Sequence, residues 1–211
     1  MRISSFNINK FCGPYSNDGR YYNPRNIDFR TPIRDIVKEN LKEKDDIFFL
    51  EEFTNNGYIN VFELFKGYKI FYNGDKLERS HVVAITLEDS LWERIDSKKD
   101  YPNKYIEMKL NELQIICFHN TCDTIFSNIE KCFASKEHDI ILGDFNGVRC
   151  DDTEGYRDLV TMDMVTFKPA QTTIDHLWVK NQERFNNKIV FNGIIETFTS
   201  DHNLLTFSLN V

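Results

Sequence analysis

Residues 140–147, with the sequence IILGDFNG, constrain the fold of this chain more than any other segment. Three consecutive aliphatic residues indicate a buried strand, and Gly143 then interrupts the apolar run. On an extended backbone, residues two apart point to the same side, so Asp144 and Asn146 would stand together where the strand meets solvent. A rigid strand that ends in an accessible loop suits a functional site. The same pattern also fits an Asx-type turn, with Gly147 relieving backbone strain.

Length and composition favour one globular domain, which we place at residues 1–211. Of the 211 residues, 41% are hydrophobic and 14% aromatic, as in folded rather than disordered proteins. No apolar run approaches the roughly 20 residues that span a bilayer. Residues 1–6 lack the apolar core of a signal peptide. We therefore expect a cytoplasmic protein without a membrane segment, and a monomer as the default state.

The cysteines and the net charge narrow the chemistry further. The five cysteines are odd in number and form no Cys-x-x-Cys pair, which favours reduced thiols over a disulfide framework. A zinc site from Cys117, His119 and Cys122 is an alternative, although the spacing is irregular for zinc ligands. The net charge of −7, without a basic block, argues against a protein that holds nucleic acid mainly through lysine and arginine. A divalent cation would instead supply much of the positive charge for a phosphate-bearing substrate.

The hydrophobic pattern predicts more strands than helices. We expect helices at 31–43, with Thr31 as N-cap and Pro32 in the first turn, and near 56–65, 123–136 and 154–161. Strands are predicted at 2–9, 46–50, 68–73, 81–87, 104–110, 113–118, 139–143, 173–179, 188–192 and 204–210, with a long loop at 11–29. This order lacks the regular strand–helix repeat of a doubly wound sheet. The predicted fold class is α/β in the α+β sense: a four-layer sandwich of two mixed, mostly antiparallel sheets packed face to face, with helices outside.

Polar residues lie at the ends of six predicted strands, each time in the same manner. These residues are Asn7, Glu52, His119, Asp144 with Asn146, Asp175, and Asp201 with His202. Any one of them is unremarkable, because many strands end in polar residues. Together they are the groups that hold a hard divalent cation and move protons around a phosphate.

The order of these segments and the residues in them resemble the motifs of the endonuclease/exonuclease/phosphatase superfamily, over nearly the whole chain. That superfamily has the deoxyribonuclease-I-like fold. The matching segments are SFNIN at 5–9, FLEE at 49–52, FH at 118–119, GDFN at 143–146, IDH at 174–176 and SDH at 200–202. One departure is Glu51, which stands where the family usually carries Gln. The resemblance implies the same sandwich fold and a site at a phosphate.

The resemblance also implies a role for each metal-side residue. Glu52 would be the principal ligand of Mg²⁺, for which Mn²⁺ could substitute. Asn7 would lie near the metal and the substrate, and Asp201 would complete the shell. Asp144 would orient or deprotonate the attacking water, and Asn146 would help to hold the phosphate.

Further roles fall on the histidine side of the site. His202 would contact the scissile phosphate, with Asp175 accepting a hydrogen bond from its other ring nitrogen. His119 would be a second histidine at the phosphate or leaving group. In the deoxyribonuclease-I branch this histidine pairs with a glutamate, for which Glu78 is the candidate, and Arg79 is an alternative phosphate contact.

The remaining acidic and histidine residues favour structural roles. Glu51 points away from Glu52 on a strand and is expected to be structural or to support its neighbours. His176 likewise points away from the Asp175 side, as a packing or hydrogen-bonded residue. His81 and His138 lack companions in the sequence and indicate ordinary surface or strand-edge positions.

The implied activity is Mg²⁺-dependent hydrolysis of phosphodiester bonds in DNA or RNA by in-line attack of an activated water. The expected partner is a nucleic acid or a nucleotide. His119 stands where exonuclease-III-type repair enzymes usually carry Tyr, which favours the deoxyribonuclease-I, sphingomyelinase and phosphatase branches. The alternatives are a phosphomonoesterase or phosphoinositide-type phosphatase, a small-nucleotide phosphodiesterase, and a catalytically inactive binding module on the same fold.

Overall fold

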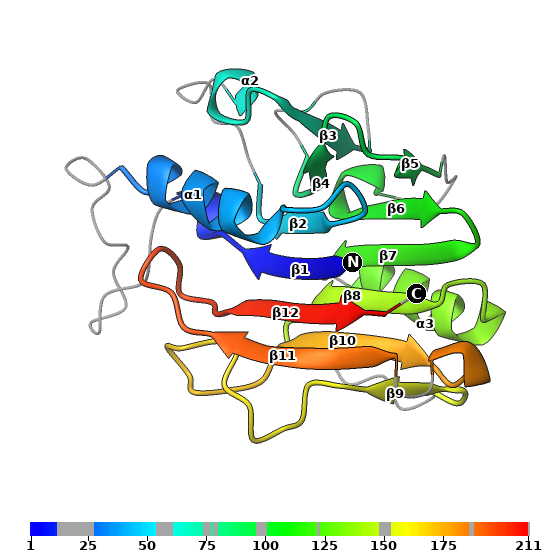
Figure 1. Cartoon of the computed structure of the whole chain (residues 1–211). Coiled ribbons are helices and arrows are strands. Elements are labelled where there is room, and N and C mark those ends of the chain that lie inside the picture. The colour runs from blue at the N-terminus through cyan, green and yellow to red at the C-terminus, as the bar shows by residue number, and fades with distance from the viewer. Residues whose placement is uncertain are drawn as a thin grey trace.

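Two six-stranded sheets form the centre of this computed structural model (Figure 1). The first sheet contains, in spatial order, β11 (Ile189–Ile195), β12 (Leu204–Leu209), β1 (Arg2–Asn7), β2 (Ile47–Glu51), β4 (Val82–Leu87) and β3 (Tyr68–Tyr72). The second contains β5 (Glu93–Arg94), β6 (Tyr105–Leu110), β7 (Leu113–His119), β8 (Ile140–Asp144), β10 (Asp175–Lys180) and β9 (Tyr156–Asp158). The structure describes residues 1–11, 28–53, 61–73, 77, 80–95, 101–121, 123–147, 153–185 and 188–210.

Helices cover the outer face of each sheet. The helix α1 (Arg30–Asn40) packs Ile33 and Val37 against the first sheet, and α3 (Asp123–Ser135) packs Ile129 and Phe133 against the second. The other helical segments are short: η1 (Asn9–Phe11), α2 (Val61–Leu64), η3 (Pro102–Lys104) and η4 (Glu183–Phe185). Two sheets with helices outside confirm the predicted four-layer sandwich. None of the helices in the described ranges has the length and apolar character needed to cross a membrane.

The central strands, such as β2 and β8, are buried on both faces, which explains their continuous apolar runs, whereas the edge strands β3, β5, β9 and β11 are partly exposed. In β2, Ile47 and Phe49 face the core between the sheets, while Phe48 and Leu50 pack toward α1. The central strand β7 alternates in the same way between the inter-sheet core and α3. Only β1–β2 and β7–β8 pair in parallel, and the other strand pairs of the described residues are antiparallel. Each parallel pair therefore brings two strand ends to the same edge of the sandwich.

The predicted start of the first helix is wrong. The helix α1 begins at Arg30, and Thr31 lies inside its first turn instead of capping it. The Asp28 carboxylate accepts the Arg30 backbone N–H at 3.0 Å, so this side chain starts the helix one residue earlier. The helix also ends at Asn40, because the backbone N–H groups of the next turn donate to Asp46.

The predicted helix at 154–161 is also wrong. Residues Tyr156–Asp158 form β9, which pairs antiparallel with β10 at the edge of the second sheet. The Tyr156 hydroxyl donates to the His138 carbonyl at 2.6 Å, and its ring packs edge-on against Phe133 at 5.2 Å. Pairing with a neighbouring strand thus overrides a weak local preference. The two-residue strand β5 was not predicted, and the predicted helix near 56–65 lies partly outside the described residues.

Gly143 lets β8 approach β7 more closely than any other residue type would. It has φ 131° and pairs with Phe118 on β7. A Cβ atom at this position would lie 1.9 Å from the Phe118 carbonyl oxygen, far inside van der Waals contact. The glycine in the GDFN segment is therefore a packing requirement of the strand that carries Asp144.

We predict that Gly143→Ala destabilises the protein by about 3 kcal/mol or more. The new methyl group would clash with the β7 backbone, and alanine would be strained at a positive φ. Gly147→Ala is the matched control, because Gly147 also has a positive φ of 74° but its Cβ would meet nothing closer than 3.8 Å. The control should lose only about 1 kcal/mol. Urea denaturation of both variants measures the difference, and equal losses would contradict the packing explanation.

Candidate active site

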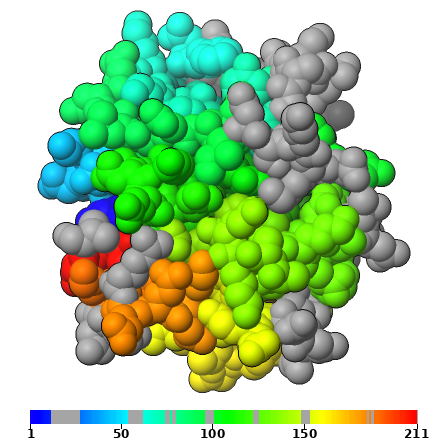
Figure 2. Space-filling model, turned by 90° about the vertical axis from the view of Figure 1, so that its right-hand side faces the viewer, coloured from blue at the N-terminus to red at the C-terminus, as the bar shows by residue number. Residues whose placement is uncertain are grey.

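Five strand ends meet at one edge of the sandwich. β1 and β2 pair Asn7 with Glu51, and β7 and β8 pair His119 with Asp144. β10 runs in the opposite direction, so its first residue, Asp175, lies across from Asp144. Asn7 Nδ2 donates to Asp144 Oδ2 in the facing sheet at 2.9 Å. The other end of the strands, seen in Figure 2, carries the green β6–β7 hairpin and the yellow-green end of α3.

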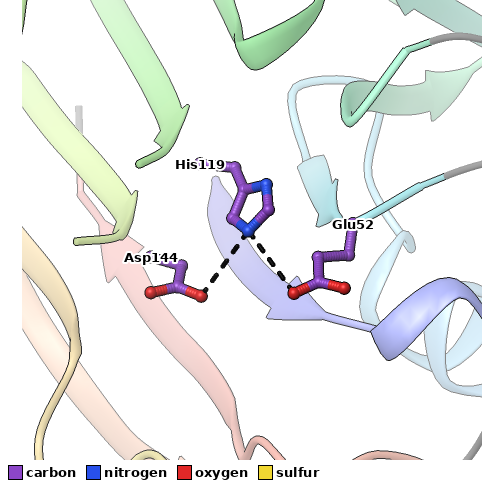
Figure 3. A group of neighbouring side chains, drawn as sticks. All are labelled: Glu52, His119 and Asp144. Atoms are coloured by element: carbon purple, nitrogen blue, oxygen red, sulfur yellow. Dashed lines mark ion pairs between the residues drawn. The ribbon is translucent and has the colours of Figure 1, made fainter. Parts of the chain in front are cut away.

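Glu52 faces this edge directly after β2. Its Oε1 lies 3.4 Å from His119 Nε2 and 3.3 Å from Asn7 Nδ2, and His119 Nε2 lies 3.9 Å from Asp144 Oδ2 (Figure 3). Burial alone would raise the pKa of Glu52. Hydrogen bonding and charge from His119, together with Asn7 and Lys10, outweigh burial and lower the pKa to about 2. Glu52 is therefore a carboxylate at neutral pH.

His202 lies on the other side of Asp144. Its Nδ1 contacts the Asp175 carboxylate at 2.9 and 3.1 Å, and its Nε2 lies 3.9 Å from Asp144 Oδ2. Burial lowers the pKa of His202, but Asp175 and then Asp144 and Asp201 raise it to about 10. Burial and Asp175 in turn raise the pKa of Asp144 to about 6, against the opposing effect of the histidines. His202 is thus an imidazolium beside a carboxylate that titrates near neutrality.

Two groups of described side chains bring possible metal ligands within 4.8 Å of one another: Glu52 with His119 and Asp144, and Asp144 with Asp175 and His202. A hard cation such as Mg²⁺ takes oxygen ligands and needs only one or two carboxylates. The ionised Glu52 and the adjacent Asp144 fit that requirement. The donor set of the site is therefore compatible with Mg²⁺ or Mn²⁺.

Asn7 and Asp201 flank this group. The Asn7 side-chain oxygen accepts the backbone N–H of Asn9 at 3.0 Å, so its amide nitrogen faces the carboxylates. Ser200 Oγ lies 2.7 Å from the Asn7 carbonyl and 3.2 Å from Asp201 Oδ1, which ties the two segments together. Burial raises the pKa of Asp201, and the nearby Glu52 adds to that rise. Asp201 thus lies in the same electrostatic environment as Glu52.

Asn146 combines the structural and the functional interpretation of the GDFN segment. Its backbone N–H donates to Asp144 Oδ1 at 2.7 Å, which is the Asx turn, and its φ of 52° is left-handed. Its side-chain amide donates to the carbonyl of Asn120. The buried Asn120 itself donates to the Phe145 carbonyl at 3.1 Å. The Asx turn therefore holds Asp144 in place, and Asn120 is a supporting residue that the sequence analysis missed.

The prediction that His81 lacks companions is wrong. Its ring stacks on His119, with ring centroids 5.8 Å apart and planes 20° from parallel. Lys104 Nζ lies 3.0 Å from His81 Nδ1. Burial, followed by the charges of Lys104 and His119, lowers the pKa of His81 to about 4. His81 precedes β4 and was missed because its partners come from the second sheet.

Other predicted residues fall elsewhere. His138 is buried, 3.3 Å from Glu107, instead of lying on the surface. His176 is hydrogen-bonded to Asp158 at 2.6 Å, as its packing role predicted. Cys117 lies in the inter-sheet core, where burial raises its pKa, so it is a poor zinc ligand. Of the residues and segments singled out in the sequence, Glu78, Arg79, Cys122 and most of the loop at 11–29 lie outside the described part of the chain.

Solved structures with this architecture share the fold along its whole length. An AP endonuclease from Archaeoglobus fulgidus is 18% identical, with a TM-score of 0.64, and each chain covers 100% of the other. A 3′–5′ exonuclease from Neisseria meningitidis is 16% identical, with a TM-score of 0.62 and 100% coverage of both chains. An endonuclease/exonuclease/phosphatase from Bacteroides vulgatus is 16% identical, with a TM-score of 0.59, covering 99% of this chain and 98% of its own. No family model and no curated protein matches the sequence.

The chain has the endonuclease/exonuclease/phosphatase fold. At these identities the likeness establishes the arrangement of strands and helices, and the site must be interpreted from its own residues. Asn7, Glu52, His119, Asp144, Asp175 and His202 are all brought together by this fold.

Glu51 is a buried carboxyl group beneath this edge of the endonuclease/exonuclease/phosphatase fold. Its Oε1 accepts the Ser5 hydroxyl and lies 3.6 Å from Cys117 Sγ, which joins the two sheets. Burial and the nearby Asp175 and Asp144 raise the pKa of Glu51 well above its usual value. The surroundings of Glu51 in the folded protein therefore favour its protonated form over the carboxylate.

We predict that Glu51→Gln becomes increasingly stabilising as the pH rises above about 4.5, the ordinary pKa of a glutamate. The folded pKa is raised, so the stability that Glu51 contributes is complete below the unfolded pKa and is lost as the pH rises. The gap should widen by up to about 1.4 kcal/mol per pH unit between the two pKa values. Urea denaturation at pH 5 to 8 with EDTA measures it.

The exposed Glu88, at the far end of β4, provides a matched control. Glu88→Gln should follow the wild-type stability at every pH. Parallel pH curves for Glu51→Gln and the wild type would show that Glu51 is ionised in the folded protein.

Proposed function

We propose that this protein is a divalent-metal-dependent phosphodiesterase that hydrolyses phosphodiester bonds of DNA or RNA. The observation that supports it best is the position of Asp144 between two histidines. His119 Nε2 and His202 Nε2 each lie 3.9 Å from Asp144 Oδ2, with the ionised Glu52 beside His119. Cationic and proton-accepting groups thus surround one small space, as hydrolysis at phosphorus requires.

Each residue has a chemical part in this proposal. With a pKa near 6, Asp144 is mostly ionised at neutral pH and can orient a water and accept its proton. The His202 imidazolium, fixed by Asp175, stabilises negative charge on the non-bridging oxygens of the phosphate. Glu52 would hold Mg²⁺ or Mn²⁺ together with Asp201, and the ion would add positive charge at the phosphate.

His119 and Asn146 complete the set of residues around Asp144. His119 lies where it can assist the leaving group, because its Nε2 faces both Glu52 and Asp144. Asn146 is anchored on the Asp144 turn and would help to hold the phosphate. Glu78 and Arg79 keep their proposed parts, as the partner of His119 and as a phosphate contact.

A phosphomonoesterase is the second candidate. The Neisseria protein that is described as a 3′–5′ exonuclease is also described as a 3′ phosphatase, bound to a product DNA hairpin. The same fold therefore occurs in a protein that is described both as a phosphodiester-cleaving exonuclease and as a phosphatase. A panel of single-stranded DNA, duplex DNA, RNA, dinucleotides, 3′-phosphorylated oligonucleotides and inositol phosphates separates the two candidates.

We predict that Glu52→Gln lowers hydrolysis of the best substrate by about 1,000-fold or more, because it removes an ionised metal ligand. EDTA should abolish the wild-type activity, and added Mg²⁺ or Mn²⁺ should restore it. Glu88→Gln is the control and should retain full activity. Wild-type activity that persists in EDTA, or Glu52→Gln as active as its control, would contradict the proposed mechanism.

A further inference from the structure

The turn that follows β1 is left-handed at three consecutive residues. Asn9, Lys10 and Phe11 have φ values of 45°, 54° and 61°, and none of them is glycine. Asparagine adopts this conformation more readily than other L-residues, but lysine and phenylalanine rarely adopt it, and a run of three such residues is unfavourable. Backbone strain of this kind persists only where the surrounding structure imposes it, and it collects at functional sites.

The surrounding structure fixes this turn from several sides. The Asn9 N–H donates to the Asn7 side chain at 3.0 Å, the Lys10 N–H to the Glu52 carbonyl at 3.2 Å, and the Phe11 N–H to the Ile8 carbonyl at 3.0 Å. The buried Phe11 ring packs against Phe53, with centroids 5.7 Å apart. Glu52 is itself left-handed, with φ 50°. Two strained segments therefore hold each other at the edge of the candidate site.

The left-handed turn places the Lys10 side chain next to Glu52. Its Nζ lies 3.7 Å from Glu52 Oε2, while Glu52 Oε1 faces His119. In Figure 3 the turn that continues β1 lies on the side of the Glu52 oxygen that is directed away from His119. The Lys10 charge also helps to lower the pKa of His81, the histidine that stacks on His119. Lys10 therefore places a cation beside the Glu52 oxygen that does not face His119.

The ion pair alone does not account for the strain. The Lys10 and Glu52 side chains are 44% and 21% exposed, and their 3.7 Å separation exceeds a hydrogen bond. Such solvent-exposed pairs contribute little to stability, and less than a left-handed lysine costs. Lysine is a flexible, strongly hydrated point charge, so a nearby anion can compete with Glu52 for its ammonium group.

We propose that Lys10 is a substrate-binding residue whose ammonium group contacts a phosphate oxygen of the substrate on the Glu52 side of the site. This inference rests on the proposed function, because it takes the ligand to be a phosphoester at Asp144 and His202. It adds a cationic contact at Glu52 to the one that His202 provides beside Asp144.

Three substitutions at Lys10 separate its charge from its backbone strain. Lys10→Gln keeps the strain and removes the charge, and should lower kcat/KM for the best substrate by about 10- to 100-fold through a raised KM. Lys10→Arg should keep most of the activity. Lys10→Gly should lose as much activity as Lys10→Gln yet raise Tm by about 2–4 °C, since glycine accepts a left-handed φ.

Lys136 is a matched control, because it has the same φ of 54°, is exposed and follows α3 at the opposite end of β8 from Asp144. Lys136→Gly should raise Tm similarly and leave kcat/KM unchanged. If Lys10 binds substrate, only Lys10→Gly should combine a higher Tm with a loss of activity. A lysine with a purely structural role would not give this combination.

Binding measurements test Lys10 without catalysis. Titration with Mg²⁺ alone should show about 2- to 10-fold tighter binding to Lys10→Gln, because a cation beside Glu52 repels the metal. Thymidine 3′,5′-bisphosphate should bind Lys10→Gln about 10-fold or more weakly than it binds the wild type. Unchanged binding of this phosphate probe to Lys10→Gln would overturn the inference.

The failure of Lys10 and the failure of the proposed function are distinguishable. A wild type that cleaves no phosphoester of the panel defeats the proposed function, and the phosphate probe then decides the role of Lys10. A wild type that cleaves its substrate, with Lys10→Gln at equal kcat/KM, defeats only the Lys10 inference. If Lys10→Gly does not fold, Lys10→Gln and Lys10→Arg still give both outcomes.

Discussion

The hydrogen bond between Asn7 and Asp144 joins the two sheets at the edge where the candidate site lies. It spans 2.9 Å between strands that are 137 residues apart in sequence. It can form because each sheet contributes one parallel pair whose strand ends share that edge. The hydrogen bond also depends on Gly143. A side chain at this position would clash with the β7 backbone and displace β8, and with it Asp144, from its place opposite Asn7. The position of Asp144 thus depends on backbone packing in one sheet and on a contact to the other.

Three buried acidic side chains in a small volume form the main electrostatic problem of this edge. Burial raises the pKa values of Glu51 and Asp144, and the charge of the neighbouring Asp175 adds to both rises. The structure relieves this repulsion in two ways: the surroundings of Glu51 favour its protonated form, and His202 carries a positive charge against Asp175. Uncompensated carboxylates would otherwise be costly to bury. The remaining excess of negative charge at Glu52 and Asp144 is what makes the site suitable for a divalent cation.

Backbone strain concentrates at the same edge. Asn9, Lys10, Phe11, Glu52 and Asn146 are five of the nine described non-glycine residues with a positive φ. Each is held by hydrogen bonds that a relaxed conformation would lose, such as the bond from Asn146 to Asp144. At Lys10, Phe11 and Glu52 the sequence gives no sign of a positive φ, whereas Asn9 and Asn146 are of a residue type that adopts it more readily. Their conformations are consequences of where the two sheets place them.

The sequence by itself determined most of the strands, the sandwich and most of the candidate site residues. Aliphatic runs next to polar residues identified Glu52, His119, Asp144, Asp175 and His202. Such runs can be recognised because the burial of a strand and the alternation of its side chains are visible in its own residues. The tertiary structure alone decided what depends on long-range contacts. It stacked His81 on His119, placed Lys10 beside Glu52 and turned Tyr156–Asp158 into an edge strand. A side chain's neighbours across two sheets, and the backbone angles that those neighbours impose, are set by the packed fold and have no local pattern.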